Sequence, residues 1–192
     1  MRYLIIFILV FMGCYDDPEQ YSRFDFVDTG IVAERQSETG PVVLVMGDSR
    51  GHLGDEWRYL RATVYNVAFG GTTMYGVKHR IHYVNEIQPD YVIIFGGVNE
   101  SRFSITFDEW RTVFDANVQA IIDAGAIPVL CDPFTARLDG GEYISREIRA
   151  YLRNTYNDYY FDSATEISWF RDHVHFSSFG YEKISENINM LF

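Results

Sequence analysis

Short, nearly uninterrupted apolar runs recur along the chain from Pro41 onward, and longer segments with a helical repeat separate them. Apolar runs of this length are typical of parallel strands that are buried on both faces of a sheet. The strands expected from this pattern are Val42–Met46, Val64–Phe69, Tyr91–Phe95, Ile127–Cys131 and a weaker fifth at Tyr159–Phe161. The pattern therefore predicts a parallel five-stranded sheet.

The intervening segments carry apolar residues at steps of three and four, the spacing of amphipathic helices. Thr106 and Glu109 have the spacing of a capping box, which predicts a helix that begins after Thr106 and stops at Gly125. Further helices are expected at about 73–87, at about 144–157 and from Ser177 to the C-terminus. Strands that alternate with helices in this way predict an α/β fold, a three-layer α/β/α sandwich.

Composition narrows the class of protein. The chain has 192 residues, of which 47% are apolar, enough for one domain with a substantial core. Its 27 acidic and 16 basic residues give a formal net charge of −11. Nucleic-acid-binding proteins show a basic surface, so we expect no nucleic-acid partner. Two cysteines cannot build a dense disulfide framework.

The N-terminus resembles an export signal. Met1 and Arg2 precede an uncharged apolar stretch that ends at Gly13, and Cys14 follows. This stretch is too short to span a bilayer, and its basic start is typical of a signal peptide. Gly13 before Cys14 resembles the lipobox of bacterial lipoproteins, which implies lipidation of Cys14, although Phe11 stands where Leu is usual. A buried strand or helix start is the alternative.

These features predict three regions: a signal peptide at 1–13, a lipidated N-terminus and polar tether at 14–40, and the folded domain at 41–192. We then expect an exported, membrane-anchored lipoprotein of the bacterial periplasm or cell surface. The lipid anchor would be its only membrane contact.

Small and polar residues stand where the predicted strands end. In open parallel sheets, ligands bind at the carboxyl ends of the strands, near the point where the strand order reverses. The clusters at these ends are Gly47-Asp48-Ser49, Gly70-Gly71 and Gly97-Val98-Asn99-Glu100, and a fourth, Asp172-His173-Val174-His175, precedes the last helix. Functional residues are expected in these four clusters.

The clusters contain the groups that acyl transfer needs. A serine such as Ser49 becomes a nucleophile when a histidine takes its proton and a carboxylate orients that histidine. Asp172 and His175 are three residues apart, so one short turn can present both side chains. The N–H groups of Ser49 and Gly71 and the side-chain amide of Asn99 are candidate oxyanion donors.

The same clusters, in this order, resemble the sequence blocks of the SGNH hydrolases in the GDSL esterase/lipase superfamily. The resemblance covers about Val42 to Phe192 and implies a flavodoxin-like fold and a serine esterase without a cofactor. It also implies a triad of Ser49, Asp172 and His175, with Ser49, Gly71 and Asn99 forming the oxyanion hole. The departures from the family pattern are Arg50 in place of an aliphatic residue, Ala68 in place of glycine and Glu100 in place of aspartate.

Other histidines offer alternatives. His173 competes with His175 as the base, but Asp172 cannot easily orient its immediate neighbour. His79 and His82 have the spacing of metal ligands on a helix; zinc would need a third partner, so we expect no metal site.

Four further residues are candidates for a substrate pocket, because they fall in loops or first helical turns beside the clusters. They are Arg50, Trp57, Tyr75 and Phe103.

The function expected on these grounds is hydrolysis of a carboxylic ester through an acyl-enzyme on Ser49. The domain shows no obvious lid insertion, which favours short acyl groups such as acetyl, on a carbohydrate or a small lipid. The expected partner is thus a small-molecule or glycan ester. Two alternatives stay open: an acyltransferase on the same fold, and a surface lipoprotein that binds glycan without catalysis.

Overall fold

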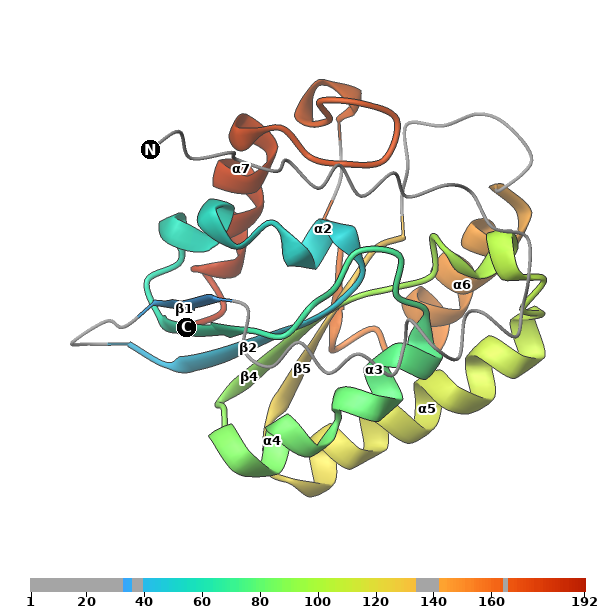
Figure 1. Cartoon of the computed structure of the whole chain (residues 1–192), viewed down its shortest axis with the longest axis horizontal. Coiled ribbons are helices and arrows are strands. Elements are labelled where there is room, and N and C mark those ends of the chain that lie inside the picture. Colours follow the sequence, from blue (N-terminus) through green and yellow to red (C-terminus); the bar gives the residue numbers. More distant parts are fainter. Residues whose placement is uncertain (1–32, 36–39, 134–141, 164–165) are drawn as a thin grey trace, which may run out of the picture.

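The computed structural model describes residues 33–35, 40–133, 142–163 and 166–192 (Figure 1). The predicted signal peptide, Cys14 and most of the predicted tether lie outside these residues and stay predictions. No helix in the described part of the chain is long and apolar enough to cross a membrane.

The parallel five-stranded sheet is confirmed, and a sixth strand joins one edge. The parallel strands are β2 (Val42–Gly47), β3 (Thr63–Asn66), β4 (Tyr91–Phe95), β5 (Ile127–Cys131) and β6 (Tyr160–Phe161). The order across the sheet is β1-β3-β2-β4-β5-β6. Because the order of the parallel strands reverses at β2, this is the flavodoxin-like arrangement, with its switch point at the carboxyl end of β2.

The sixth strand is β1 (Ala33–Arg35), which pairs antiparallel with β3, Glu34 lying opposite Tyr65. The prediction that all of 14–40 is a tether is wrong for these three residues. Backbone hydrogen bonds to an open sheet edge hold β1, and such bonds leave no hydrophobic repeat in the sequence.

Helices cover both faces of the sheet, which confirms the three layers (Figure 1). One face carries α3 (Met74–Arg80), α4 (His82–Ile87), α5 (Phe107–Asp123) and α6 (Glu142–Thr155); the other carries α7 (Ser178–Ile188) and the 3₁₀-helix η1 (Gly54–Tyr59). Side chains of β2 alternate between the two cores: Leu44 and Met46 pack on the first face, Val43 and Val45 on the second. The strand is therefore apolar throughout because both of its faces are buried.

The capping box at the start of α5 is present. Thr106 Oγ1 accepts the Glu109 N–H at 3.3 Å, and the Glu109 carboxylate accepts the Thr106 N–H at 2.8 Å. Past the end of this helix Gly125 has φ +85°, the left-handed conformation that stops a helix.

The single helix expected at 73–87 is wrong, since the chain forms α3 and α4, which meet at Ile81. The Ile81 N–H bonds to Lys78 O, and the Val84 N–H bonds to Ile81 O. Both are three-residue bonds, which tighten the turn and interrupt the four-residue ladder of an α-helix. No glycine or proline marks this break in the sequence.

Candidate active site

A sharp turn after β2 places Ser49 at the carboxyl edge of the sheet. Ser49 is the first residue of α2 (Ser49–His52), and Asp48 caps this helix by accepting the Arg50 N–H at 2.9 Å. Gly47 has φ +119°, and a Cβ there would lie 1.8 Å from Phe95 O. Only glycine fits where β2 passes so close to β4. Ser49 thus stands at the switch point of the sheet.

His175 lies between Ser49 and Asp172. Its Nε2 is 2.9 Å from Ser49 Oγ, and its Nδ1 is 2.9 Å from Asp172 Oδ2. With its proton on Nδ1, the ring donates to Asp172 and accepts the Ser49 proton on Nε2. The structure therefore joins the three residues predicted as a triad in one hydrogen-bonded chain.

Backbone hydrogen bonds keep Asp172 ionised. Its Oδ1 accepts the N–H groups of Val174 and His175, both at 2.7 Å. Burial raises the pKa of Asp172, but these bonds and the His175 ring outweigh burial and lower it to about 2. The carboxylate is therefore charged at neutral pH, as is needed to orient an imidazole. The neighbouring His173 is exposed.

The loop that carries Asp172 and His175 is closed at its base. Phe170 and Phe176 form an antiparallel bridge, and the Arg171 N–H donates to His175 O at 2.9 Å. The loop follows the 3₁₀-helix η3 (Ile167–Trp169) and leads into α7. These contacts fix the position of the imidazole relative to the sheet.

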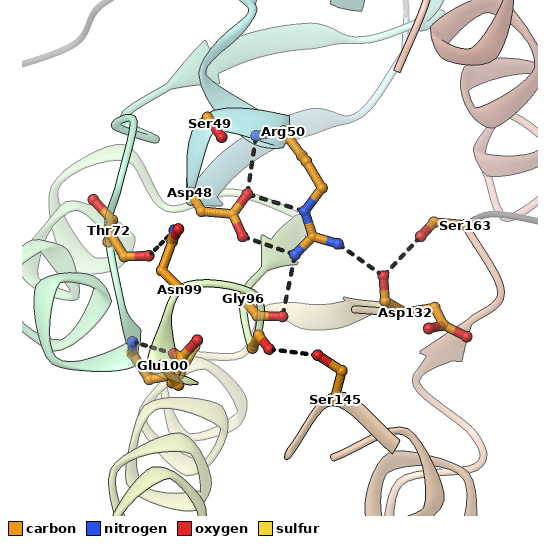
Figure 2. Close-up of polar contacts among 12 residues, drawn as sticks. Asp48, Ser49, Arg50, Thr72, Gly96, Asn99, Glu100, Asp132, Ser145 and Ser163 are labelled. Carbon is orange, nitrogen blue, oxygen red and sulfur yellow. Dashed lines mark hydrogen bonds and ion pairs between the residues drawn. The ribbon is translucent and has the colours of Figure 1, made fainter. Parts of the chain in front are cut away.

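The Gly70-Gly71 segment lies beside Ser49, and Asn99 is hydrogen-bonded to the same loop. A Cβ on Gly70 would lie 3.9 Å from Ser49 Cβ, and Gly71 has φ +81°, which lets the turn close. Asn99 Nδ2 donates to Thr72 O at 3.0 Å (Figure 2). A carboxamide has two N–H donors, so this bond fixes the Asn99 amide and leaves a second N–H for an oxyanion.

Arg50 is buried, so the prediction that it lines a substrate pocket is wrong. Its guanidinium donates to both carboxylate oxygens of Asp48, at 3.1 and 2.7 Å (Figure 2). It also donates to Gly96 O at 3.2 Å and to Asp132 O at 3.1 Å. Burial alone would lower the pKa of Arg50, but its surroundings, with Asp48 foremost and Asp132 also contributing, outweigh burial and raise it. Arg50 therefore ties the Ser49 turn to the carboxyl ends of β4 and β5.

Trp57 is also buried, so its assignment to the pocket is wrong as well. Only 1% of it is exposed, and its ring packs against Phe95 and Tyr181. The indole ring has a large apolar surface, and it is buried more fully between η1 and the sheet than it would be at the edge of a substrate pocket. Tyr75 is exposed and Phe103 partly exposed, so both can still meet a substrate.

Side chains from three other elements hold the main chain of α2. Asn66 Nδ2 and Trp57 Nε1 donate to Gly51 O at 2.7 and 2.9 Å, and the Tyr181 hydroxyl donates to Arg50 O at 2.6 Å. These bonds satisfy the carbonyls that a four-residue helix leaves open. Sequence reasoning missed Tyr181, because a tyrosine inside an amphipathic helix gives no sign of its hydroxyl partner.

His79 and His82 are both exposed. Within the described ranges, no group of three His, Cys, Asp or Glu side chains could hold a metal ion.

The chain matches the GDSL-like lipase/acylhydrolase family over residues 46–183. No curated protein matches it. Its structure resembles that of a G-D-S-L family protein from Desulfitobacterium hafniense DCB-2, which is 19% identical, with a TM-score of 0.68 over 80% of this chain and 100% of that one.

Two esterases also have a similar structure. An acetylxylan esterase from Geobacillus stearothermophilus is 17% identical, with a TM-score of 0.59 over 78% of this chain and 93% of that one. The psychrotrophic esterase EstA from Pseudoalteromonas sp. is 15% identical, with a TM-score of 0.58 over 77% and 93%. Two solved catalytic mutants of the acetylxylan esterase replace an aspartate and a histidine three residues apart.

These likenesses show the fold, and the family match spans well over half of the chain. The chain therefore belongs to the GDSL-like lipase/acylhydrolase family and is a serine hydrolase that acts on esters.

Proposed function

We propose that this esterase removes short acyl groups, acetyl above all, from a carbohydrate or a small lipid, with Ser49 as the nucleophile. The observation that carries the proposal is the hydrogen-bonded chain from Asp172 through His175 to Ser49. Nucleophile, base and orienting carboxylate are in hydrogen-bond reach without any rearrangement.

In the proposed reaction, Ser49 Oγ attacks the ester carbonyl while His175 Nε2 takes the hydroxyl proton. The oxyanion that forms accepts hydrogen bonds from the N–H groups of Ser49 and Gly71 and from the Asn99 amide. Collapse breaks the ester C–O bond, and the protonated His175 gives its proton to the leaving alcohol. Water then attacks the acyl-enzyme by the same route and releases the acid.

Two observations support the substrate class. The acetylxylan esterase acts on an acetylated polysaccharide by its name, and its catalytic aspartate and histidine have the spacing of Asp172 and His175. The Asp172 and His175 side chains are 46% and 30% exposed, so the triad is open to solvent. An open site of this kind suits a short acyl group on a bulky alcohol better than a long chain that needs a deep apolar pocket.

The test compares the full-length chain with Ser49→Ala on p-nitrophenyl acetate, butyrate and octanoate, and then on acetylated xylo-oligosaccharides with release of acetate as the readout. Ser168→Ala is the matched control, because Ser168 is exposed and its hydroxyl donates to Glu166, a residue outside the candidate site. We expect acetate turnover by the wild type and Ser168→Ala, and a loss of at least ~10³-fold in Ser49→Ala. Equal activity in Ser49→Ala would overturn the nucleophile, and a preference for octanoate would overturn the acyl class.

We further propose that the chain is exported, cleaved before Cys14 and lipidated there, which would hold the esterase at a membrane. The basic residue, short apolar stretch and Gly13-Cys14 pair support this. Cys14→Ser should then lose an incorporated lipid label and leave the membrane fraction, whereas Cys131→Ser should keep both.

A further inference from the structure

Glu100 is a fully buried carboxyl group beside the candidate oxyanion site. It follows Asn99 and is the first residue of the 3₁₀-helix η2 (Glu100–Phe103). None of its surface is exposed, and its Oε1 accepts the Met74 N–H at 3.0 Å. Among the described residues, its other oxygen, Oε2, has no hydrogen-bond partner. A buried carboxyl with one unsatisfied oxygen is costly, and its placement therefore needs a reason.

Asn99 and Glu100 together clasp the loop that carries Gly71. Asn99 donates to Thr72 O (Figure 2), and Glu100 accepts from the Met74 N–H. Consecutive side chains therefore hold the chain on both sides of Thr73. Thr73 is the N-cap of α3 but its own side chain makes no capping bond, so Glu100 supplies the cap. The spacing between the two candidate oxyanion donors, the Gly71 N–H and the Asn99 amide, depends on this clasp.

The charge of Glu100 matters because of where it lies. Among the described residues, the Asp48 carboxylate opposes the ionisation of Glu100 and the Arg50 guanidinium favours it. Arg50 already pairs with both oxygens of Asp48, so ionised Glu100 would add an uncompensated negative charge. Burial raises the pKa of Glu100 to about 7, which brings its ionisation into the working range of an esterase.

We propose that Glu100 is a positioning residue of the oxyanion site: as a neutral acid it fixes the Gly71 loop against Asn99, and its ionisation slows acylation. A negative charge buried near the site disfavours the oxyanion that develops in the transition state, so its effect falls on kcat rather than on substrate binding. This inference rests on the proposed function.

The experiment measures kcat and KM for p-nitrophenyl acetate from pH 5 to 9, with Ser49→Ala subtracted as the background. The variants are Glu100→Gln, a neutral isostere that can still accept the Met74 N–H, and Glu100→Leu, which cannot. Glu186→Gln is the control, since Glu186 is exposed on α7. In ¹³C-labelled protein, the carboxyl shift of Glu100 follows its titration without reference to activity.

We expect kcat of the wild type and of Glu186→Gln to fall about tenfold above neutral pH, well short of the ~10²–10³-fold loss on removal of an oxyanion donor. Glu100→Gln should lack this fall. Glu100→Leu should have a reduced kcat at every pH, with little change in KM. The same alkaline fall in Glu100→Gln, or a Glu100 titration below pH 5, would overturn the inference. Undiminished turnover by Ser49→Ala would instead overturn the proposed function, and the carboxyl titration would still decide the state of Glu100.

Discussion

The pKa values of Glu100 and Asp172 are shifted in opposite directions, and the surroundings of the two carboxyl groups explain why. Glu100 is fully buried, and desolvation outweighs the backbone hydrogen bonds to its carboxyl and raises its pKa to about 7. Asp172 is exposed and accepts hydrogen bonds from two backbone N–H groups and from the His175 ring, which lower its pKa to about 2. Asp172 is therefore charged where the imidazole needs an anion. Glu100 is protonated below about pH 7, which keeps a negative charge away from the candidate oxyanion site.

Asp172→Asn should therefore lower kcat by roughly 10²–10⁴-fold, with little change in KM or in stability. The asparagine carbonyl can still accept the Val174 and His175 N–H groups, so the loop keeps its shape. Its amide, however, would present a donor to His175 Nδ1 and favour the wrong tautomer. Steady-state kinetics at pH 7 on an acetyl ester, with His173→Asn as the matched control, give the readout. A kcat within threefold of the wild type would show that Asp172 does not orient His175.

Glu100 also predicts a dependence of stability on pH. Because its folded-state pKa, about 7, lies above the ordinary value of 4.5, the folded protein holds this proton more tightly than the unfolded chain. The free energy of unfolding should therefore fall as the pH rises from about 4.5 through about 7, by on the order of 3 kcal/mol. In urea titrations across this range, Glu100→Gln should gain stability relative to the wild type, and Glu186→Gln should not. Parallel curves for Glu100→Gln and the wild type would contradict the raised pKa.

The candidate triad could be predicted from sequence because its members sit at strand ends and at a fixed short spacing, both of which local patterns record. The residues that hold the site in place could not be predicted in this way. Because Arg50 is charged and follows the serine, the sequence predicts that it lines the substrate pocket. Its real partners include Asp132 and Gly96, which are distant in sequence and meet only at the sheet edge. The burial of Glu100 comes from the same kind of long-range packing.

At the scale of elements, Arg50 links α2 to the carboxyl ends of β4 and β5. Removing its guanidinium should therefore destabilise the fold. Arg50→Met leaves the Asp48 carboxylate, 1% exposed, without its cation, which typically costs about 3–5 kcal/mol. Urea unfolding measures the loss. The control is Arg111→Met, whose exposed pair with Asp108 should contribute less than about 1 kcal/mol.

A second variant tests whether the unpaired Asp48 carboxylate causes the loss of stability. Adding Asp48→Asn to Arg50→Met removes this buried negative charge and should recover part of the lost stability. If the free energy of unfolding of Arg50→Met lies within about 1 kcal/mol of the wild-type value, the guanidinium does not hold these elements together.

The elements themselves were predictable to the extent that each carried its own signal. The β2, β4 and β5 runs are apolar throughout because they are central, and α5 has a complete capping box. The features that were not predicted depend instead on contacts with other parts of the fold. The break at Ile81 has no glycine or proline, and β1 is held by the edge of β3.

At the scale of the whole molecule, β1 closes an edge of the sheet that would otherwise be open. It pairs with β3 from Ala33 opposite Asn66 to Arg35 opposite Val64. β3 runs directly toward the Gly70-Gly71 turn, and Asn66 at its end donates to Gly51 O in α2. The edge strand therefore backs the part of the sheet that supports the candidate site.

A chain that begins at Gly40 should for this reason differ from one that begins at residue 33. Without β1, the outer N–H and C=O groups of β3 lie open, and such an edge can pair with a second copy. We expect the shorter chain to unfold at lower urea, with a loss of about 2 kcal/mol for the missing backbone bonds, and to self-associate in sedimentation velocity. The longer chain should stay monomeric under the same conditions. Equal stability and equal sedimentation of the two chains would mean that β1 adds nothing to the domain, and that the domain begins near Pro41 after all.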